Sequence, residues 1–547
     1  MTHAGEDPGI DRRELLKWGV RGAGLLSMAA LIGACGDASG SGQSTTSGGG
    51  PALSPGPSGS GQPKRGGTLT VGVISGGSSE TLNPQKMVSA GDAIRAIALY
   101  DGLYVIGNGG PQPGLATSAE PNKDGTVWTL QLRSGVHWHD GKPFTADDVL
   151  YTMNTWKDAN QAFFSPTALA VMDLNGVRKR GPLTVEVPLT RAFAQFPDVI
   201  ASPFARVIQD GFRNFSRPAG TGPFRYQSFS PGSSSTLVAN PSYWGGAPYV
   251  ETLVVNSSFT DPAAILNAVV GGSVSIAPVV PPALAKAYAS MNAVILGNAR
   301  GPGFIPPTMR VNVPPFNDPR VVRAFKLVVD RQAFVTDVFD GYATVGNDSP
   351  GAGLKYWASD LKTPYDPEQA KSLLKAAGQE GMAIPLYTSP VVPGMVESAT
   401  LYAAQAAVAG LKVQIAQLPA STYFTPASSP GYLSNQRHFS MNYWQAQPAL
   451  TTLYVEALYS QAVYNETGWA TSNPAQDKLV TEAMAELDPA KAADKWHAVQ
   501  QQQVMEGGYI VPANVNFVDA YAPNVRNGNT SLWGDNSQYI YTKIWLA

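Results

Sequence analysis

The residues whose types could perform chemistry are few, and their spacing limits what they could do. His137 and His139 form the one cluster with ligand-like spacing, in the run His137-Trp138-His139-Asp140. Side chains two residues apart on a strand share a face, as two zinc ligands would. No third strong ligand follows nearby, so the pair makes a poor metal site. We interpret the two imidazoles as structural, with a hydrogen bond to the turn at Asp140-Gly141.

Motifs of nucleophilic and phosphate-binding enzymes do not occur in the sequence. A nucleophile elbow needs the pattern G-x-S-x-G, which is absent. The only Gly-Lys pair, Gly141-Lys142, is followed by Pro143, so a Walker A loop is absent as well. Asp147-Asp148 is explained by favourable negative charge at a helix N-terminus. We predict no catalytic residue and no cofactor. A secreted hydrolase remains the alternative from another class, because carboxylates distant in sequence could converge.

The first 35 residues are typical of an export signal that ends at the only cysteine. Arg12-Arg13 precede an uncharged apolar stretch from Gly22 to Gly33, as in a twin-arginine signal. A helix of that length spans about 18 Å, short of the ~30 Å hydrocarbon core of a membrane. The stretch ends in Leu31-Ile32-Gly33-Ala34-Cys35, which resembles a bacterial lipobox. We therefore predict lipidation of Cys35 and anchoring to the cell membrane; the alternative is a buried cysteine after an ordinary signal.

Residues 36–65 consist mainly of Gly, Ser, Pro, Thr and Gln, with almost nothing to bury. Such a composition predicts a disordered tether, and folding should begin near Gly66. The 547 residues leave room for two or three domains after it. With 38 basic and 40 acidic residues, the chain lacks the positive field that nucleic-acid binding needs, so nucleic acid is an unexpected partner.

Strand-like and helix-like patterns alternate along the remaining chain. Residues 68–73 and 126–133 alternate in polarity as strands do, and Thr145 stands at capping-box spacing from Asp148 at the start of a helix. This interleaving predicts a mixed α/β protein. Further strands are expected at 236–239, 252–256 and 412–417, and further helices at 319–339, 367–377, 397–409 and 473–504.

Several blocks of sequence closely resemble the family 5 extracellular solute-binding proteins, which include the dipeptide- and oligopeptide-binding components of ABC importers. The longest block runs from Leu115 to Val149 and contains Leu132-Arg133-Ser134-Gly135-Val136-His137-Trp138-His139-Asp140-Gly141-Lys142-Pro143. The other blocks follow in the family's order: Leu82-Asn83-Pro84, Gly220-Thr221-Gly222-Pro223-Phe224, Asn240 to Tyr249, Phe316 to Phe325, Asp330-Arg331, Tyr365 to Ala370 and Ala409 to Val413.

The resemblance implies a two-lobed, periplasmic-binding-protein-like fold of type II, cluster C, with an extra domain inserted in the first lobe. It places the first lobe at 66–300 with the insertion at about 110–220, the second lobe at 301–511, and a return to the first lobe at 512–547. It further implies a monomer that encloses a peptide or other small molecule between the lobes and delivers it to ABC permease subunits outside the membrane.

The resemblance also implies where ligand would bind. Val88, Ser89 and Ala90 follow the Leu82-Asn83-Pro84 block in the first lobe and would contact ligand mainly through backbone N–H and C=O groups. In the second lobe the candidates are Tyr423, Tyr443, Trp444, Gln445, Ala446 and Gln447. For Trp444 a role as a core aromatic is the alternative, and Tyr243, Trp244 and Tyr249 are expected to pack.

One departure from the family pattern bears on the ligand. Peptide binders carry a segment like W-x-A-D whose Asp pairs with the peptide ammonium, and Gln447 stands at that position here. Loss of a charge partner from such a pair costs about 2–5 kcal/mol, whereas an amide suits hydroxyls, amides or blocked termini. A free-terminus dipeptide is therefore disfavoured, and longer or modified peptides, oligosaccharides and a nickel or metal-chelate ligand, for which His438 is the only support, stay open. A solute sensor without transport is a further alternative.

Overall fold

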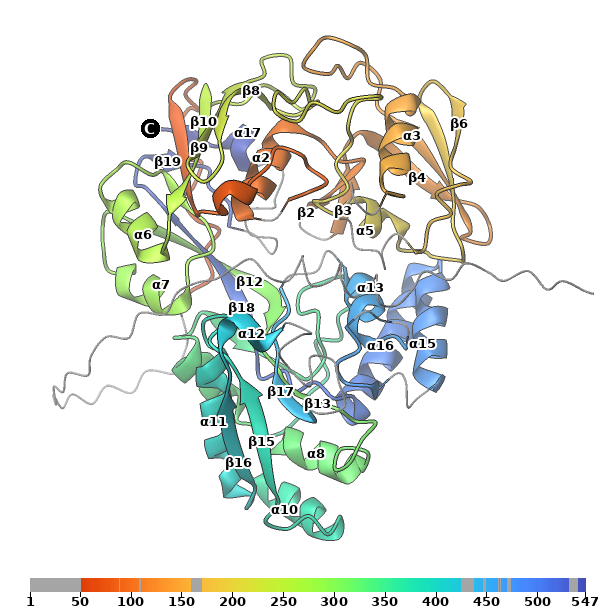
Figure 1. Ribbon diagram of the computed structural model, residues 1–547, viewed down its shortest axis with the longest axis vertical. Helices are drawn as coiled ribbons and strands as arrows, with labels where there is room; N and C mark the ends of the chain where they lie inside the picture. Colours follow the sequence, from red (N-terminus) through yellow and green to blue (C-terminus); the bar gives the residue numbers. More distant parts are fainter. Residues whose placement is uncertain are drawn as a thin grey trace, which may run out of the picture.

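The computed structural model describes residues 51–87, 89–107, 110–158, 170–424, 437–445, 449–460, 462, 464–469, 474–530 and 540–547. The predicted signal, Cys35 and the first half of the predicted tether lie outside the described residues. The described chain forms two lobes, one above the other in Figure 1.

An eight-stranded mixed sheet forms the core of the upper lobe. Its strand order is β12-β18-β11-β1-β10-β9-β8, with β14 beside β18. β1 is parallel to β10 and β11, and the remaining pairs are antiparallel. The strands are β1 (Thr68–Ile74), β8 (Phe224–Ser230), β9 (Ser234–Ala239), β10 (Thr252–Phe259), β11 (Ile276–Ala277), β12 (Ile295–Phe304), β14 (Ala343–Val345) and β18 (Ala513–Tyr521).

Helices and a small ribbon complete this part of the upper lobe. The helix α2 packs on β1, β8 and β10, and α6 packs on β1, β10 and β11, so that the sheet buries Leu69, Val71 and Leu253 fully. The elements are η1 (Gly77–Ser79), α2 (Ala90–Leu99), α6 (Pro262–Val270), α7 (Pro282–Tyr288), β19 (Val525–Arg526), α17 (Ile540–Lys543) and β20 (Trp545–Leu546).

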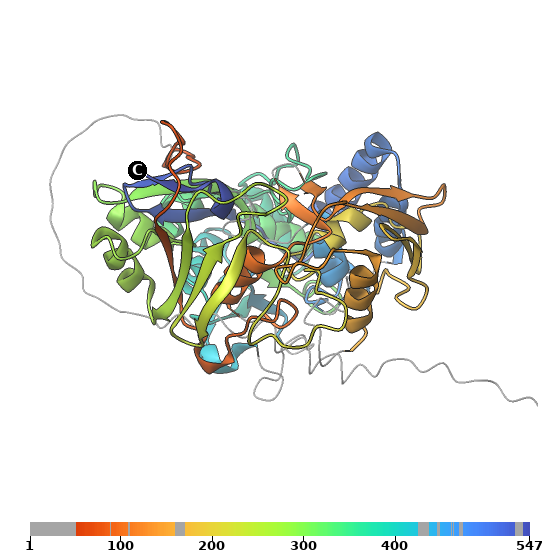
Figure 2. The same cartoon turned by 90° about the horizontal axis from the view of Figure 1, so that it is seen from above.

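A separate four-stranded antiparallel sheet, ordered β4-β5-β7-β6, stands beside the first sheet in the upper lobe (Figure 2). Trp128 and Leu130 of β5 point into its core, where they meet Val149 of α3. The elements of this inserted part are β2 (Tyr104–Gly107), β3 (Gly110–Pro113), β4 (Ala116–Pro121), β5 (Val127–Leu132), α3 (Ala146–Thr155), β6 (Arg178–Gly181), β7 (Thr184–Pro188) and α5 (Phe196–Ile200).

The lower lobe is built on a four-stranded sheet with the order β13-β17-β15-β16. Phe325, Tyr402 and Phe439 meet in its core, with ring centroids 5.3 to 6.5 Å apart. The elements are β13 (Pro307–Met309), α8 (Pro319–Leu327), α9 (Arg331–Ala333), η2 (Phe334–Val338), α10 (Pro367–Ala376), β15 (Ala383–Thr388), α11 (Met395–Val408), β16 (Lys412–Gln417), α12 (Ala420–Tyr423), β17 (Phe439–Met441), α13 (Leu450–Leu453), η3 (Tyr454–Leu458), α15 (Pro474–Ala485) and α16 (Pro489–Glu506).

The strands β12 and β18 join the lobes at a waist (Figure 1), where β14 also pairs with β18. β12 pairs with β18 as far as Phe304, and the chain enters the lower sheet at Pro307. On the return, Thr308 pairs with Tyr509, and β18 begins at Ala513. Since β14 lies within the segment 301–511 yet pairs with β18 in the upper sheet, the two lobes are interleaved here more than the sequence boundaries imply.

The inserted part of the upper lobe also contacts the lower lobe. Phe196 of α5 belongs to one buried cluster with Met484 of α15 and Trp496 of α16. Ala194 N–H donates a hydrogen bond of 2.7 Å to the Met484 carbonyl, and the Arg191 guanidinium lies 5.4 Å from the ring centre of Tyr459. The lobes therefore touch on the side away from the waist.

Most predicted elements are confirmed, but two long helical predictions are wrong. The helix expected at 319–339 is divided into α8, α9 and η2, and in the described part of the helix expected at 473–504 the chain forms α15 and α16. In each case an aspartate begins a new helix: Asp330 caps α9, and Asp488 caps α16 just before Pro489. A proline lacks the N–H that a continuous helix would need, so Asp488-Pro489 starts a helix instead of continuing one.

Residues 51–65, the second half of the predicted tether, make contacts with the folded part of the chain. Ser54 and Asn298 of the edge strand β12 exchange backbone hydrogen bonds of 2.9 and 2.6 Å. Thr530 N–H donates to the Pro55 carbonyl, and the Arg65 guanidinium donates to the Pro248 carbonyl at 3.2 Å. The unpaired edge of a sheet binds backbone of any composition, which the low hydrophobicity of this segment did not reveal.

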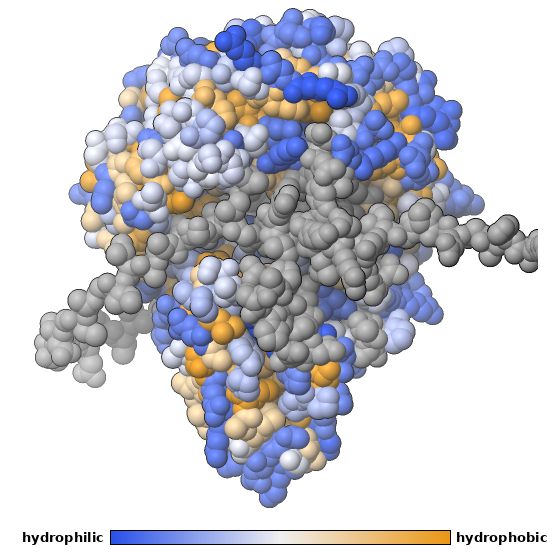
Figure 3. Space-filling model, viewed as in Figure 1, coloured by the Kyte–Doolittle hydropathy of each residue, from blue (hydrophilic) through white to orange (hydrophobic). Residues whose placement is uncertain are grey.

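The surface mixes polar and apolar residues. Figure 3 shows both kinds interspersed over the coloured face of each lobe. The large apolar residues that are most exposed, Val408 and Met505, belong to different helices, α11 and α16. Singly exposed apolar residues of this kind need no functional explanation.

Candidate functional site

One histidine of the cluster, His139, connects two of the sequence blocks. His139 Nδ1 accepts a hydrogen bond from Gly220 N–H at 3.1 Å, so Nε2 carries the proton and donates to the Gly222 carbonyl at 2.9 Å. Burial lowers the pKa of His139 to about 4, which keeps the ring neutral. The structural interpretation is confirmed for His139, but its partner is the segment at 220–222 and not the turn at Asp140-Gly141. His137 is exposed.

A second buried cluster explains the aromatic block near residue 243. The Asp101 carboxylate accepts hydrogen bonds from Thr221, Tyr243 and Trp244, at 2.8 to 2.9 Å. Desolvation raises the pKa of Asp101, and these donors oppose that rise. The guanidinium of Arg133 covers the Trp244 ring at 4.4 Å. These aromatic residues pack and anchor the upper lobe, as predicted for Tyr243 and Trp244.

The predicted ligand segment of the first lobe leads into α2. Ser89 is the N-cap residue: its Oγ accepts from Asp92 N–H at 3.1 Å, while its own N–H donates to the Asp92 carboxylate at 3.2 Å. Such a reciprocal pair is a capping box. Ala90 is the first residue of the helix and is half-buried. Val88 lies outside the described residues.

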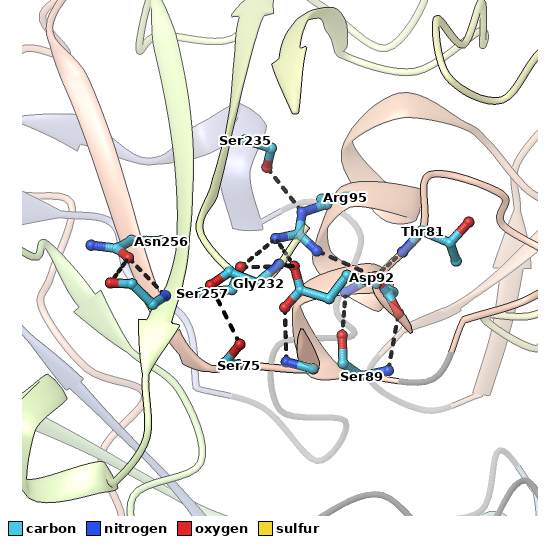
Figure 4. A network of polar contacts seen from close by, with 12 residues as sticks. Ser75, Thr81, Ser89, Asp92, Arg95, Gly232, Ser235, Asn256 and Ser257 are labelled. Carbon is cyan, nitrogen blue, oxygen red and sulfur yellow. Dashed lines mark hydrogen bonds and ion pairs between the residues drawn. The ribbon is translucent and has the colours of Figure 1, made fainter. Parts of the chain in front are cut away.

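A buried network fixes this segment to the sheet (Figure 4). The Arg95 guanidinium forms ion pairs with Glu80 at 3.1 Å and Asp92 at 3.2 Å. It also donates to Ser235 on β9 at 3.0 Å and Ser257 on β10 at 2.9 Å. All three charged side chains are fully buried.

The same carboxylates bind the backbone of the connection between β1 and α2. Glu80 accepts from Gly76 N–H at 2.9 Å and, across the sheet, from Gly232 N–H at 3.0 Å. Asp92 accepts from Thr81 N–H at 2.9 Å. Residues 76–89 are thus attached at both ends to one charged network. Sequence reasoning missed it, because Glu80, Arg95 and the two serines are far apart in the chain.

The predicted segment of the second lobe follows β17 and runs along the waist. Trp444 exchanges backbone hydrogen bonds of 2.9 and 3.0 Å with Phe304, the last residue of β12. Its ring is 8% exposed and packs edge-to-face on Tyr464. Tyr443 is half-buried against Phe424, and Gln445 is exposed. Ala446 and Gln447 lie outside the described residues.

Tyr423 has a packing position. Its side chain is 1% exposed, and its hydroxyl donates to the carbonyls of Met441 at 2.7 Å and Tyr387 at 3.0 Å. The Arg437 guanidinium lies 4.8 Å from the ring centre. The structure therefore does not bring Tyr423 to a surface where it would meet a ligand.

A carboxyl group that the sequence did not single out joins the Trp444 segment. Glu466 accepts a hydrogen bond from the Tyr509 hydroxyl at 3.1 Å, and the side chains of Asn442 and Trp444 also donate to it. The Trp444 indole N–H additionally lies 3.1 Å from the Tyr509 oxygen. Desolvation raises the pKa of Glu466 to about 8, against the effect of these donors. Only the fold brings Glu466 to this place, 22 residues after Trp444 in the chain.

The described residues hold no group of three or more His, Cys, Asp and Glu side chains arranged for a metal ion. His438 precedes β17, and its carbonyl accepts a hydrogen bond from Arg310 N–H at 2.9 Å. Among the described helices, none has both the length and the apolar character needed to span a bilayer.

Comparison with known proteins shows which family and which relatives this chain is similar to. The model of the bacterial extracellular solute-binding proteins, family 5 Middle, matches residues 110–495. The dipeptide-binding protein of Escherichia coli K12 is 29% identical over 355 residues, which cover 59% of this chain and 66% of that protein, just under two thirds of its length. The glutathione-binding protein of Pectobacterium atrosepticum is 25% identical over 425 residues, which cover 74% of this chain and 80% of that protein.

Solved structures share the fold at lower identity. HbpA2 of Haemophilus parasuis has a TM-score of 0.77 at 20% identity, covering 88% of this chain and all of that one. DppA of Helicobacter pylori with the peptide STSA has 0.70 at 18% identity, covering 88% and 98%. NikZ of Campylobacter jejuni with Ni(L-His) has 0.70 at 18%, covering 88% and 99%. These structural similarities show the two-lobed α/β fold. Because the family model matches more than half of the length of this chain, the chain belongs to the family 5 bacterial extracellular solute-binding proteins.

Proposed function

We propose that this chain is the extracytoplasmic substrate-binding component of an ABC importer, and that it binds a peptide or peptide-like solute between its lobes. The observation that carries the proposal is the pairing of two lobes through the strands of the waist, with polar residues of a candidate site beside that waist at 442–445 and 466. The names of the relatives, which bind dipeptides and glutathione, support a peptide-like ligand.

Capture would work by closure of the lobes. A ligand that contacts both lobes does so fully only in the closed state, so its binding shifts the population toward that state. The first-lobe contribution would come from the segment before α2, and the second-lobe contribution from residues 443–447. A permease could then distinguish the occupied protein by its shape. No bond of the ligand is made or broken in this scheme, so the protein acts as a monomeric binding protein and not as an enzyme.

Anchoring to the membrane completes the proposal. The lipobox-like run that ends in Cys35 would receive the lipid after export by the twin-arginine route, and the folded part would remain outside the membrane. The contacts of residues 51–65 with β12 support a short distance between the anchor and the first lobe, because only 15 residues separate Cys35 from Pro51.

Identification of the cargo tests this function. Mass spectrometry under native conditions would detect a small molecule retained through purification, and a thermal-shift panel would compare dipeptides, tripeptides, glutathione, Ni(L-His) and maltooligosaccharides. A ligand at 100 times its Kd stabilises the folded state by about 2.7 kcal/mol. We expect peptides or glutathione to raise the Tm. Stabilisation by Ni(L-His) alone would assign the metal-chelate function instead, which the likeness to NikZ suggests, and turnover of a panel member would indicate an enzyme.

A further inference from the structure

Glu466 lies in the candidate site with its hydrogen-bonding partners drawn from that site. Trp444, whose side chain lowers the pKa of Glu466 as a donor, belongs to the predicted ligand segment, and Asn442 lies just before that segment. Tyr509, which donates to the Glu466 carboxylate, lies four residues before β18. Glu466 itself stays partly exposed, although protein surrounds it closely enough to desolvate it. Part of Glu466 therefore remains accessible beside the Trp444 segment.

The groups around Glu466 are arranged for a negative charge but supply little positive charge. An ionised carboxylate has about four acceptor positions, and the Tyr509 hydroxyl fills one of them at 3.1 Å. Arg310 attracts the carboxylate electrostatically, yet its Nη1 donates to the main-chain carbonyl of Glu466, at 3.4 Å, and not to the carboxylate. The Glu466 carboxylate therefore keeps an acceptor position for a donor of the ligand and a negative charge that a cationic ligand could balance.

We propose that Glu466 binds a cationic, hydrogen-bond-donating group of the ligand, such as a peptide ammonium. This inference rests on the proposed function and names the ligand chemistry of its site. It also changes the expectation drawn from Gln447: the negative charge that segment 444–447 lacks would come from a different part of the chain. A ligand with a free amino group is then favoured over one with a blocked terminus.

Binding of such a group would release a proton. Burial raises the pKa of Glu466 to about 8, so the carboxyl of the empty protein holds its proton at neutral pH, and a bound cation favours the ionised form. Affinity for the cation should therefore rise as pH increases from 6 toward 8. The groups that face Glu466 are Arg310, Tyr509, Tyr464 and Tyr423, and burial raises the pKa of each tyrosine, so none of these groups titrates in that range.

The test compares matched ligands on the full-length protein. Trialanine and glutathione each carry a free ammonium, and their N-acetylated forms do not. Isothermal titration at pH 7 in buffers of different ionisation enthalpy reports both affinity and protons released. For wild type we expect tighter binding of a free-amine probe and release of a fraction of a proton. Glu466→Gln should weaken that binding by about thirtyfold or more and abolish the proton release, because the neutral amide leaves the ammonium without a charge partner.

Controls separate this role from a structural one. Glu482→Gln changes an exposed glutamate of α15 and should leave both readouts at wild-type values. The Tm of the empty Glu466→Gln protein checks that it folds, and its affinity for an N-acetylated probe should equal that of wild type. Equal losses for free and acetylated probes, or unchanged affinity for the free amine, would overturn the inference while the proposed function stood. If no free-amine probe binds wild type, the inference is also overturned; if in addition nothing in the wider panel binds, the proposed function fails with it.

Discussion

His139 shows how one side chain joins two parts of the upper lobe. It receives a hydrogen bond from Gly220 and gives one to Gly222, so the imidazole must be neutral and in a single tautomer. The two glycines are required because a Cβ at either position would overlap the backbone of Leu99. At this scale the sequence predicted a structural histidine correctly. It could not reveal the partner, which is about 80 residues distant.

The titration of His139 predicts how stability depends on pH. Burial lowers its pKa to about 4, whereas an unfolded histidine titrates near 6.5. As pH falls through this window only the unfolded chain gains the proton, so stability falls by up to about 3 kcal/mol. His139→Asn does not titrate, so the stability difference between wild type and variant should shrink by about 2–3 kcal/mol from pH 7.5 to pH 4.5. Urea unfolding at pH 7.5 and pH 4.5 measures the difference in unfolding free energy between wild type and variant. If this difference is the same at both pH values, His139 is not held neutral in the folded protein.

The elements of the fold were predictable to different degrees. The strand expected at 126–133 and the capping box of Thr145 and Asp148 follow from local patterns, and both are confirmed, the strand as β5. The connection between β1 and α2 depends instead on Arg95, which joins residues from Glu80 to Ser257. The pairing of Glu466 with Trp444 likewise needs the fold of the lower lobe. Contacts between residues distant in sequence have no local signature, which is why these two features were missed.

Removal of the Arg95 side chain tests the role of that network. Arg95→Met would leave Glu80 and Asp92 as buried carboxylates without their cation, which costs about 3–5 kcal/mol. Hydrogen exchange should then increase at residues 76–89, whose backbone those carboxylates bind.

Arg320→Met provides the matched control for that variant. Arg320 pairs with Asp318 on the surface, where such a pair contributes about 0–1 kcal/mol. It should leave exchange at residues 76–89 unchanged. Comparable effects of the two substitutions on stability and exchange would mean that the buried network does not hold the segment.

At the scale of the whole molecule, two regions connect the lobes. The waist of β12, β14 and β18 is continuous chain, whereas the contact of α5 with α15 and α16 is made only by packing. If the waist acts as a hinge, the two lobes can open on the opposite side when the packed contact of α5 with α15 and α16 separates. The sequence resemblance implied two lobes and an inserted domain. It did not indicate that the insertion shares a core with the lower lobe, because that core draws on residues from 103 to 511.

The location of the whole molecule depends on Cys35. Cys35→Ser removes the thiol that would carry the lipid, and we expect the protein to move from the membrane fraction to the soluble fraction when its native host or a bacterial host with the lipoprotein pathway produces it. Fractionation followed by immunoblotting measures this change. Sedimentation of the variant with membranes, at the level of wild type, would argue against the lipid anchor.

The most direct measurement of the central claim is small-angle X-ray scattering of the purified protein with and without saturating peptide or glutathione. If ligand draws the two lobes together around the strands of the waist, the radius of gyration decreases on binding, and the decrease is lost when the ligand is dialysed away. An identical scattering profile in the presence of a ligand shown to bind would contradict capture by closure.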